Sequence, residues 1–261
     1  MKRVLSIAGS DSSGGAGIQA DIKTITTHKM YAMTVVTAIT AQNTKGVFGV
    51  YDSSSESVSS QIDCVFDDIF PDSVKIGMVS STNIIETIAN KLKKYNAKNI
   101  VLDPVMISTS GSKLLDDVAI SALTTILMPT ATIITPNISE AECLSNLTIK
   151  TKKDMEKAAI IISKNYGGFI LVKGGHLNDC CDDLLYANGQ LTWFEQIKIN
   201  NLNTHGTGCT LSSSIACGLA EGLTVHESIK QAKIYVTGAI NSNLNLGKGS
   251  GPLNHCWNIN H

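Results

Sequence analysis

The sequence predicts an α/β fold with a mostly parallel central sheet and an antiparallel hairpin at its edge. Apolar runs of strand length occur at residues 4–8, 34–40, 73–78, 99–103, 131–135 and 169–173. Helical patterns separate them, as over 81–95, where Ile84, Ile88 and Leu92 recur at intervals of four. This alternation is typical of a parallel sheet covered by helices, and the almost wholly apolar runs agree with strands buried on both faces.

The last third of the chain departs from this alternation. Residues 182–198 contain two strand-like runs around Asn188-Gly189, a dipeptide typical of tight hairpin turns. We therefore expect antiparallel strands at a sheet edge there, followed by two long helices over 208–222 and 225–244. Because no linker, charge block or internal repeat interrupts the chain, residues 1–261 are expected to form a single domain.

Composition limits the classes of function. The chain has 261 residues, 43% of them hydrophobic, which is enough for a sizeable core. A net charge of −1 argues against nucleic acid as the main partner, and no apolar run approaches the roughly 20 residues that span a membrane. The N-terminus also lacks the long apolar stretch of a secretory signal. Seven scattered cysteines without a C-x-x-C pair favour a reducing cytoplasm over a disulfide framework or a zinc site.

The stretch GGAGIQAD at 14–21 raises the possibility of a nucleotide site. Gly15, Gly17 and Ala20 fit the G-x-G-x-x-G/A pattern of dinucleotide-binding turns. However, that pattern follows its strand directly, whereas about six residues separate Ala8 from Gly15, and no acidic residue ends the second strand. Two alternatives remain open: a turn that only packs a helix, or a loop that approaches a small ligand, with Asp21 pointing its carboxylate into the pocket.

Other candidates follow the strand ends, where open α/β sheets bind ligands. The Gln42 amide offers a donor beside an acceptor and can pair with a ring nitrogen and its neighbouring amino group, although a loop glutamine is more often simply solvated. Asp103 ends one buried strand, and Glu140 opens a helix after the next. Each can serve as a cap alone, but together they are hard oxygen ligands that suit magnesium beside phosphates.

Two further stretches indicate an anion site. Lys173 closes an apolar run, where a lysine is costly unless an anion lies near it. Gly206-Thr207-Gly208 opens a long helix of small residues, and the free N–H groups at such a helix start bind anions. Cys209 lies in the first turn, where the helix dipole is expected to lower a thiol pKa; the alternative is an inert buried cysteine.

Seven motifs occur in order over nearly the whole chain: AGSDSSGGAGIQAD, TAQNT, KIGM, LDPVM, TPNISEAE, VKGGH and THGTGCTLS. Together they closely resemble the hydroxymethylpyrimidine (phosphate) kinases of thiamine biosynthesis, within the ribokinase superfamily. The resemblance implies a ribokinase-like three-layer α/β/α fold. It also implies transfer of the γ-phosphate of ATP, with Mg²⁺, to 4-amino-5-hydroxymethyl-2-methylpyrimidine and then to its monophosphate, by a cytoplasmic homodimer.

The resemblance also implies roles for individual residues. It assigns substrate binding to Gly9, Asp21, Gln42 and Met78, and the catalytic turn to Gly206, Gly208 and Cys209, with Cys209 as the base and Lys173 near the transferred phosphate. Nucleotide and phosphate contacts fall to Asn137, Lys173, Thr207 and Gly208, and magnesium to Asp103 and Glu140. The sequence departs from many relatives at 107–111, where they have an Ala-Lys pair, and at Ser250, where they often have histidine.

Three other functions are weighed against this one. A pyridoxal kinase, or an enzyme that accepts both vitamins, shares the fold, but Gln42 favours the aminopyrimidine. A nucleotide-binding regulatory protein without turnover does not explain the joint presence of Asp21, Glu140, Lys173 and Cys209. A dinucleotide-dependent oxidoreductase depends on the weak glycine pattern at 14–21 alone.

Overall fold

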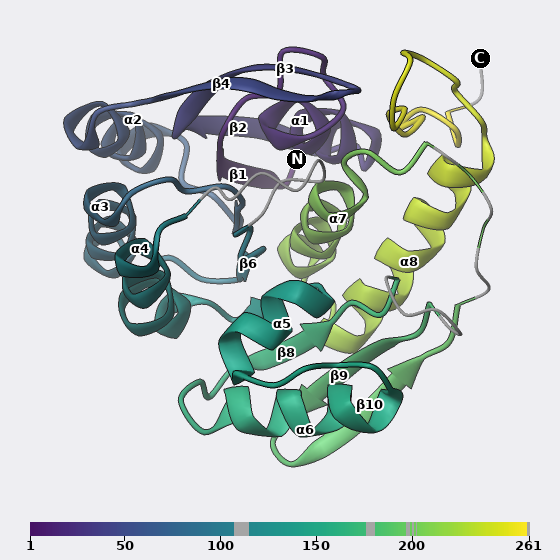
Figure 1. Ribbon diagram of the computed structural model, residues 1–261. Coiled ribbons are helices and arrows are strands. Elements are labelled where there is room, and N and C mark those ends of the chain that lie inside the picture. Colours follow the sequence, from purple (N-terminus) through teal and green to yellow (C-terminus); the bar gives the residue numbers. More distant parts are fainter. Residues whose placement is uncertain (107–114, 176–180, 197–198, 200, 202, 260–261) are drawn as a thin grey trace.

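The computed structural model describes residues 1–106, 115–175, 181–196, 199, 201 and 203–259, and its central feature is an eight-stranded sheet (Figure 1). The strand order is β10-β9-β8-β7-β6-β5-β1-β2. The neighbours from β8 to β2 are parallel, whereas β9 pairs antiparallel with both β8 and β10. The predicted parallel sheet with an antiparallel edge hairpin is confirmed.

The sheet strands lie close to the predicted runs. Their bounds are β1 Arg3–Ala8, β2 Tyr31–Val36, β5 Ser73–Ile76, β6 Ile100–Leu102, β7 Ile133–Ile134, β8 Phe169–Val172, β9 Asp183–Ala187 and β10 Gln190–Phe194. Alternate residues of a strand face opposite sides, and in β1 Val4 joins one apolar cluster while Leu5 joins the other. The strands are therefore buried on both faces, which explains their continuous apolar character.

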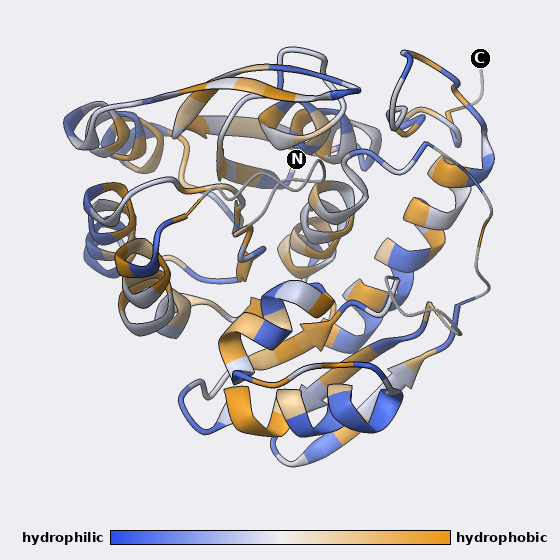
Figure 2. Cartoon of the chain, in the orientation of Figure 1, coloured by the Kyte–Doolittle hydropathy of each residue, from blue (hydrophilic) through white to orange (hydrophobic). Residues whose placement is uncertain are grey.

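Helices cover the two faces as separate layers. On one face α1 (Gly17–Thr27), α7 (Thr207–Glu221) and α8 (Val225–Asn241) pack on the sheet, and α7 and α8 lie side by side (Figure 1). The other face carries α2 Ser55–Asp68, α3 Thr82–Lys94, α4 Asp117–Ala122 with the short turns Leu123–Leu127 and Met128–Thr130, α5 Ile138–Ser145 and α6 Lys152–Ser163. Figure 2 shows β8 as hydrophobic, whereas α6 and α8 mix hydrophobic and hydrophilic residues, as expected for helices covered on one side only.

The predicted strand 34–40 is wrong as a single element. The chain leaves the sheet at Thr37, and β3 (Ala38–Asn43) pairs antiparallel with β4 (Gly46–Asp52) in a separate two-stranded sheet. Figure 1 shows this hairpin beside α1, outside the main sheet. In β3, burial alternates from Ala38 to Ala41, so one face of the hairpin is covered and the other is open to solvent. The hairpin thereby carries Gln42 over the carboxyl ends of the strands.

A fully buried ion pair links the sheet to the first helical layer. The Lys75 Nζ atom on β5 lies 2.9 and 2.8 Å from the two carboxylate oxygens of Asp21 on α1, and both side chains are 0% exposed. The same carboxylate accepts hydrogen bonds from Ser6 on β1 (2.6 Å) and Ser213 on α7 (2.7 Å). Burial alone lowers the pKa of a lysine, but the Asp21 carboxylate outweighs it and raises the pKa of Lys75.

We expect Asp21→Ala to lower the free energy of unfolding by about 3–5 kcal/mol, because it leaves the Lys75 ammonium buried without a counter-charge. Urea unfolding of the variant measures this. Asp21→Ala combined with Lys75→Met removes both charges and is expected to recover much of the loss. A loss below about 1 kcal/mol for Asp21→Ala would show that the buried charge relaxes to solvent.

Candidate functional site

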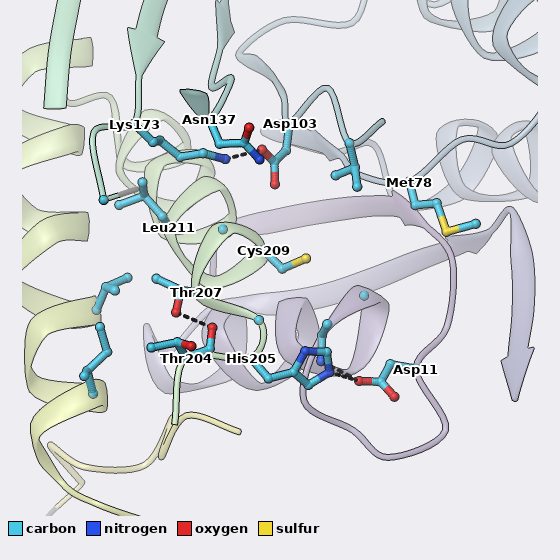
Figure 3. Close-up of a pocket in the computed structure, with 18 of the residues that line it drawn as sticks. Asp11, Met78, Asp103, Asn137, Lys173, Thr204, His205, Thr207, Cys209 and Leu211 are labelled. Carbon is cyan, nitrogen blue, oxygen red and sulfur yellow. Dashed lines mark hydrogen bonds and ion pairs between the residues drawn. The ribbon is translucent and has the colours of Figure 1, made fainter. Parts of the chain in front are cut away.

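A cavity of about 880 Å³ opens at the carboxyl ends of the parallel strands, between the start of α7 and the β3–β4 hairpin. Loops distant in sequence bring its lining together. Eleven of the twelve predicted site residues line it, namely Gly9, Gln42, Met78, Asp103, Asn137, Glu140, Lys173, Gly206, Thr207, Gly208 and Cys209. Figure 3 shows Lys173, Asn137 and Asp103 gathered at one side of it, Met78 at another, and Cys209 between them.

The loop before α1 is organised by a side chain of its own. The Asp11 Oδ2 atom accepts hydrogen bonds from the backbone N–H groups of Gly15 (3.0 Å) and Ala16 (2.8 Å), and Oδ1 accepts from Ser13. The first N–H groups at this helix start are therefore bound to the protein itself. This removes the basis for a phosphate site at the glycine pattern, and with it the main support for a dinucleotide-dependent function.

The second glycine-rich loop packs directly against the first. His205 Nε2 lies 2.8 Å from Asp11 Oδ2, and Figure 3 shows the two side chains facing one another. Gly206 has a φ of +83°, and a Cβ there would lie 1.8 Å from the Gly15 carbonyl oxygen. No other residue type tolerates both conditions without moving one loop. The starts of α1 and α7 are thus held together at one end of the cavity.

The start of α7 forms an anion site with a nearby cation. The first intrahelical donor of α7 is Thr210, which bonds to the Gly206 carbonyl, so the N–H groups of Gly208 and Cys209 precede the helical ladder. A Cβ at Gly208 would lie 3.4 Å from Lys173 Nζ and from Asp103 Oδ2. Open backbone N–H groups, a helix N-terminus and an ammonium group therefore surround the same small space.

Lys173 and Asp103 are paired. The Lys173 Nζ atom donates to Asp103 Oδ1 at 2.7 Å, and the Thr135 hydroxyl donates to the same oxygen at 3.0 Å. Burial alone lowers the pKa of Lys173, but Asp103 and Glu140 raise it above its ordinary value. The lysine is thus a fixed positive charge at the anion site.

Glu140 opens α5 in a capping box with Asn137. The Asn137 N–H donates to Glu140 Oε2 at 2.7 Å, and the Glu140 N–H donates to Asn137 Oδ1 at 2.9 Å. Burial raises the pKa of the Glu140 carboxyl to about 7; Lys173 opposes this, and the Asp103 carboxylate adds to it. The negative charge of the ionised Glu140 carboxylate is therefore only partly compensated by Lys173, and a divalent cation would supply the missing positive charge.

The carboxylate ligands offered here suit magnesium better than a cation whose ligands must all come from the protein. Asp103 and Glu140 supply two carboxylates at one cavity wall. In the part of the chain that the structure describes, no three His, Cys, Asp or Glu side chains gather as a metal site. Magnesium commonly takes one or two carboxylates and completes its shell with water and phosphate oxygens.

The structure contradicts the expected acidity of Cys209. Burial of the thiol raises its pKa above the ordinary value; the Lys75 ammonium opposes this, and Asp21 and Asp103 add to it. The backbone N–H of Gly17, at the start of α1, also contacts the sulfur and lowers the pKa, but not enough to reverse the shift. The position at a helix start was therefore a poor guide to this pKa, since burial of the thiol is the largest influence on it.

Asp21 is the exception among the predicted site residues. Its carboxylate lies behind the cavity wall, bonded to Lys75, Ser6 and Ser213, and it is not among the lining residues. The expectation that it points into the pocket is wrong. Lys75 takes its place at the wall, because the lysine of the KIGM motif lines the cavity while its ammonium group holds Asp21.

Sequence reasoning missed several residues of the cavity. Lys75 interrupts an apolar strand, which is the signal that singled out Lys173 and applies equally here. Asp11, Thr40 and His205 stand within quoted motifs or beside one, yet nothing in their spacing indicates that they meet. Residues 107–111 lie outside the described part of the chain. Ser250, the other departure, has its Oγ atom 3.2 Å from that of Thr204 at the entrance of the α7 loop.

Comparison with known proteins places this geometry in a family. The family model described as phosphomethylpyrimidine kinase matches residues 11–254. A hydroxymethylpyrimidine/phosphomethylpyrimidine kinase of Streptomyces coelicolor is 43% identical over 97% of this chain and 94% of its own length. The thiamine biosynthesis bifunctional protein ThiED of Geobacter sulfurreducens is 45% identical over 97% of this chain, but only 52% of that protein is covered.

Two solved structures extend the comparison to the fold. A phosphomethylpyrimidine kinase from Clostridium difficile is 47% identical, with a TM-score of 0.83 over 92% of this chain and 100% of that one. The ADP complex of Bacillus subtilis pyridoxal kinase is 37% identical, with a TM-score of 0.90 over 98% of both chains. The fold is thus shared by kinases named for two different vitamins.

The raised pKa of Glu140 predicts a stability that depends on pH. Between its ordinary value of 4.5 and about 7, the folded protein keeps a proton that the unfolded chain releases, so stability falls as pH rises through that window. In the absence of divalent cations, Glu140→Gln should therefore raise the free energy of unfolding by about 1–3 kcal/mol at pH 8 and change it little near pH 4.5.

Denaturant unfolding at the two pH values, in chelator, measures this. The matched control is Glu86→Gln on the solvent-exposed side of α3, where no such difference is expected. A Glu140→Gln variant with equal or lower stability than the parent at pH 8 would contradict the prediction.

Proposed function

The chain belongs to the phosphomethylpyrimidine kinase family and is a phosphotransferase, and we propose that it phosphorylates 4-amino-5-hydroxymethyl-2-methylpyrimidine and then its monophosphate, using ATP, in thiamine biosynthesis. One observation carries the proposal. A single cavity is lined by a side-chain amide suited to an aminopyrimidine edge, at Gln42, by the start of α7 with its open N–H groups, and by the Cys209 thiol.

The anion site supports the transfer of a phosphoryl group. In this proposal the β- and γ-phosphates lie against the N–H groups of Gly208 and Cys209, and Lys173 neutralises charge on the group in transit. Asn137 and Thr207 stand at the same wall and complete the phosphate contacts. Asp103 and Glu140 would hold Mg²⁺, which supplies further charge neutralisation at the phosphate oxygens when bound.

The substrate hydroxyl must lose a proton as the phosphoryl group arrives. Cys209 lies between the anion site and Met78, and we assign it as the base. Because its pKa is raised, the thiol is protonated in the free protein near neutrality, and thiolate becomes available as pH rises. The N–H groups of the same turn act on the phosphate and do not depend on this ionisation.

The aminopyrimidine ring is assigned to the other end of the cavity. Gly9 and Met78 form a close wall, since a Cβ at Gly9 would lie 3.3 Å from the Met78 sulfur. Gln42 extends from the β3–β4 hairpin and lines the same cavity. A flat ring between them has its edge paired with the amide and its hydroxymethyl group directed toward Cys209.

Pyridoxal is the second candidate substrate, and one observation favours it. The TM-scores to the pyridoxal kinases of Bacillus subtilis (0.90) and Staphylococcus aureus (0.91) are higher than that to the phosphomethylpyrimidine kinase (0.83). The amide of Gln42 still favours a ring nitrogen beside an amino group, which pyridoxal lacks.

We also propose a homodimer in the cytoplasm. The outer face of the β3–β4 hairpin exposes Ile39 (61%), Phe48 (71%) and Tyr51 (66%), and Ile39 and Tyr51 are register partners. Such exposed apolar groups are typical of an interface, and sedimentation of the purified protein tests this state. The thiols of Cys64, Cys209, Cys217 and Cys256 are free, which suits a reducing compartment. None of the described helices combines the length and apolar character needed to cross a bilayer.

Release of ADP with Mg²⁺ and ATP tests the proposed activity. The rate with the aminopyrimidine alcohol should exceed the rate with pyridoxal, and both should exceed the rate without an alcohol. A folded protein that releases no ADP with the aminopyrimidine would refute the proposed function. Equal kcat/KM values for the two alcohols would assign it to both vitamins.

Cys209→Ala should lower kcat by about 10²–10⁴-fold, the typical contribution of a positioned base. The wild-type rate should rise with pH from 7 to 9 as thiolate forms, and the variant should lack that part of the rise. Any contribution of Glu140 to the pH profile remains in both proteins, so their difference isolates the thiol.

The matched control is Cys217→Ala, which removes a buried thiol of the same helix outside the cavity. Its kcat should stay close to that of the parent. A Cys209→Ala rate within tenfold of wild type, under conditions where chemistry limits turnover, would assign this cysteine to packing.

A further inference from the structure

The amide group of Gln42 lies between two polar side chains. One end of the amide is 3.1 Å from Thr40 Oγ1, and the other end is 3.4 Å from His205 Nε2. The oxygen and the NH₂ group of a glutamine amide have nearly the same shape, so the hydrogen-bond network decides which end is which. Both neighbours are themselves fixed, which allows the assignment to be made.

His205 offers no acceptor to its end of the amide. Its Nε2 atom lies 2.8 Å from Asp11 Oδ2, an oxygen that also accepts from the N–H groups of Gly15 and Ala16. Although burial acts in the opposite direction, these hydrogen bonds hold the pKa of Asp11 well below its usual range, so the group is a carboxylate and accepts only. His205 Nε2 therefore carries the hydrogen that it donates to Asp11 and has no lone pair left to accept one, so an NH₂ group beside it would set donor against donor, and the amide end there must be the oxygen.

Thr40 presents an acceptor to the other end. Its hydroxyl has one hydrogen, and the carbonyl oxygen of Ser10 lies 2.7 Å away, closer than the amide at 3.1 Å. Once that hydrogen is given to Ser10, Thr40 Oγ1 accepts a hydrogen bond, and the amide end beside it must be the NH₂ group. The two neighbours thus require the same orientation independently.

We propose that Thr40 and the Asp11–His205 pair fix the Gln42 amide with its oxygen toward α7 and its NH₂ group toward Thr40, so that the site selects an amino group over a carbonyl group on the substrate ring. This inference rests on the proposed function for the identity of the ring. Thr40, Asp11 and His205 act as positioning residues, because they work through Gln42.

The orientation agrees with the place where phosphoryl transfer is proposed. The amide oxygen pairs with the 4-amino group, and the NH₂ group pairs with ring nitrogen N3. The amino group then lies on the His205 side of the amide, toward the helix start that bears Cys209. The hydroxymethyl group is bonded to the ring carbon next to the one that bears the amino group, on the side away from N3. The reverse orientation of the amide would direct that hydroxymethyl group away from Cys209.

A fixed amide also discriminates between rings of the same shape. The 4-oxo analogue, 5-hydroxymethyl-2-methylpyrimidin-4(3H)-one, has a carbonyl in place of the amino group and an N–H in place of the N3 lone pair. Against the fixed amide, the carbonyl oxygen of the analogue faces the amide oxygen, and its N–H group faces the amide NH₂ group. An amide free to turn would accommodate either ring, whereas the fixed one rejects the analogue.

Calorimetry on the purified protein tests the proposal by comparing dissociation constants for the aminopyrimidine alcohol and its 4-oxo analogue. The wild type should prefer the aminopyrimidine by about 10²-fold or more. Thr40→Val keeps the shape but removes the acceptor, and should reduce that preference about tenfold or more, chiefly by tighter binding of the analogue. Thr40→Ser restores the hydroxyl and should restore the preference.

The matched control is Thr24→Val, a buried threonine of α1 outside the cavity, which should leave the preference unchanged. A Thr40→Val preference within about threefold of wild type would overturn the proposal, as would a wild-type preference below about tenfold. A crystal structure of the wild type with the aminopyrimidine gives an independent test: an amino group at the Thr40 end of the amide would also overturn it.

ADP release separates this inference from the function on which it rests. If the wild type binds the aminopyrimidine with the stated preference but releases no ADP, the kinase function fails and the fixed amide stands. If it releases ADP and the Thr40→Val preference does not change, the fixed amide fails and the function stands.

Discussion

The Lys75–Asp21 ion pair is the constraint on which the arrangement of the site depends. Removing two charges from water is costly, and the cost is offset only when the geometry and the surrounding hydrogen bonds are complete. Here that requires β5, α1, β1 and α7 to meet at one carboxylate. The ion pair therefore fixes α1 and α7, the helices that follow the two glycine-rich loops, to the sheet. It does so directly behind the cavity wall, which Lys75 lines.

The two glycine-rich loops are also joined directly to each other, by the contact between Asp11 and His205. A single carboxylate accepts hydrogen bonds from Gly15 and Ala16, directly before α1, and from His205, two residues before α7 begins. The start of α1 is thus closed to a ligand by its own loop, whereas the start of α7 keeps open N–H groups beside Lys173. Two similar glycine-rich patterns consequently differ in the backbone N–H groups that they leave open, and only contacts between loops distant in sequence distinguish them.

Local sequence patterns were sufficient for the sheet and most of its helices, because strands buried on both faces are continuously apolar. They were insufficient at Thr37, where the chain leaves the sheet without a glycine or proline to mark the break. The rule that ligands bind beyond the strand ends correctly predicted that Asp103, Glu140 and Lys173 line the cavity. It failed for Asp21, whose partners come from other elements, and for the acidity of Cys209, whose thiol is buried by the packing of other elements; no local pattern records either.

The break at Thr37 has a mechanical consequence. The Thr37 N–H donates to Ala8, its carbonyl accepts from Ser53, and its hydroxyl donates to Met78, so both strands of the hairpin are clamped at their root. Ser10 bonds to Ala38 just beyond that root. The turn is held as well, because the Thr44 hydroxyl accepts from the N–H groups of Lys248 and Gly249 (3.2 Å each), so the hairpin behaves as a beam supported at both ends. Gln42 stands between the two supports, where the Ser12 hydroxyl accepts from its backbone N–H (2.9 Å) and donates to its carbonyl (2.8 Å), so a load on the outer face would be shared by both supports rather than bend the strand at Gln42.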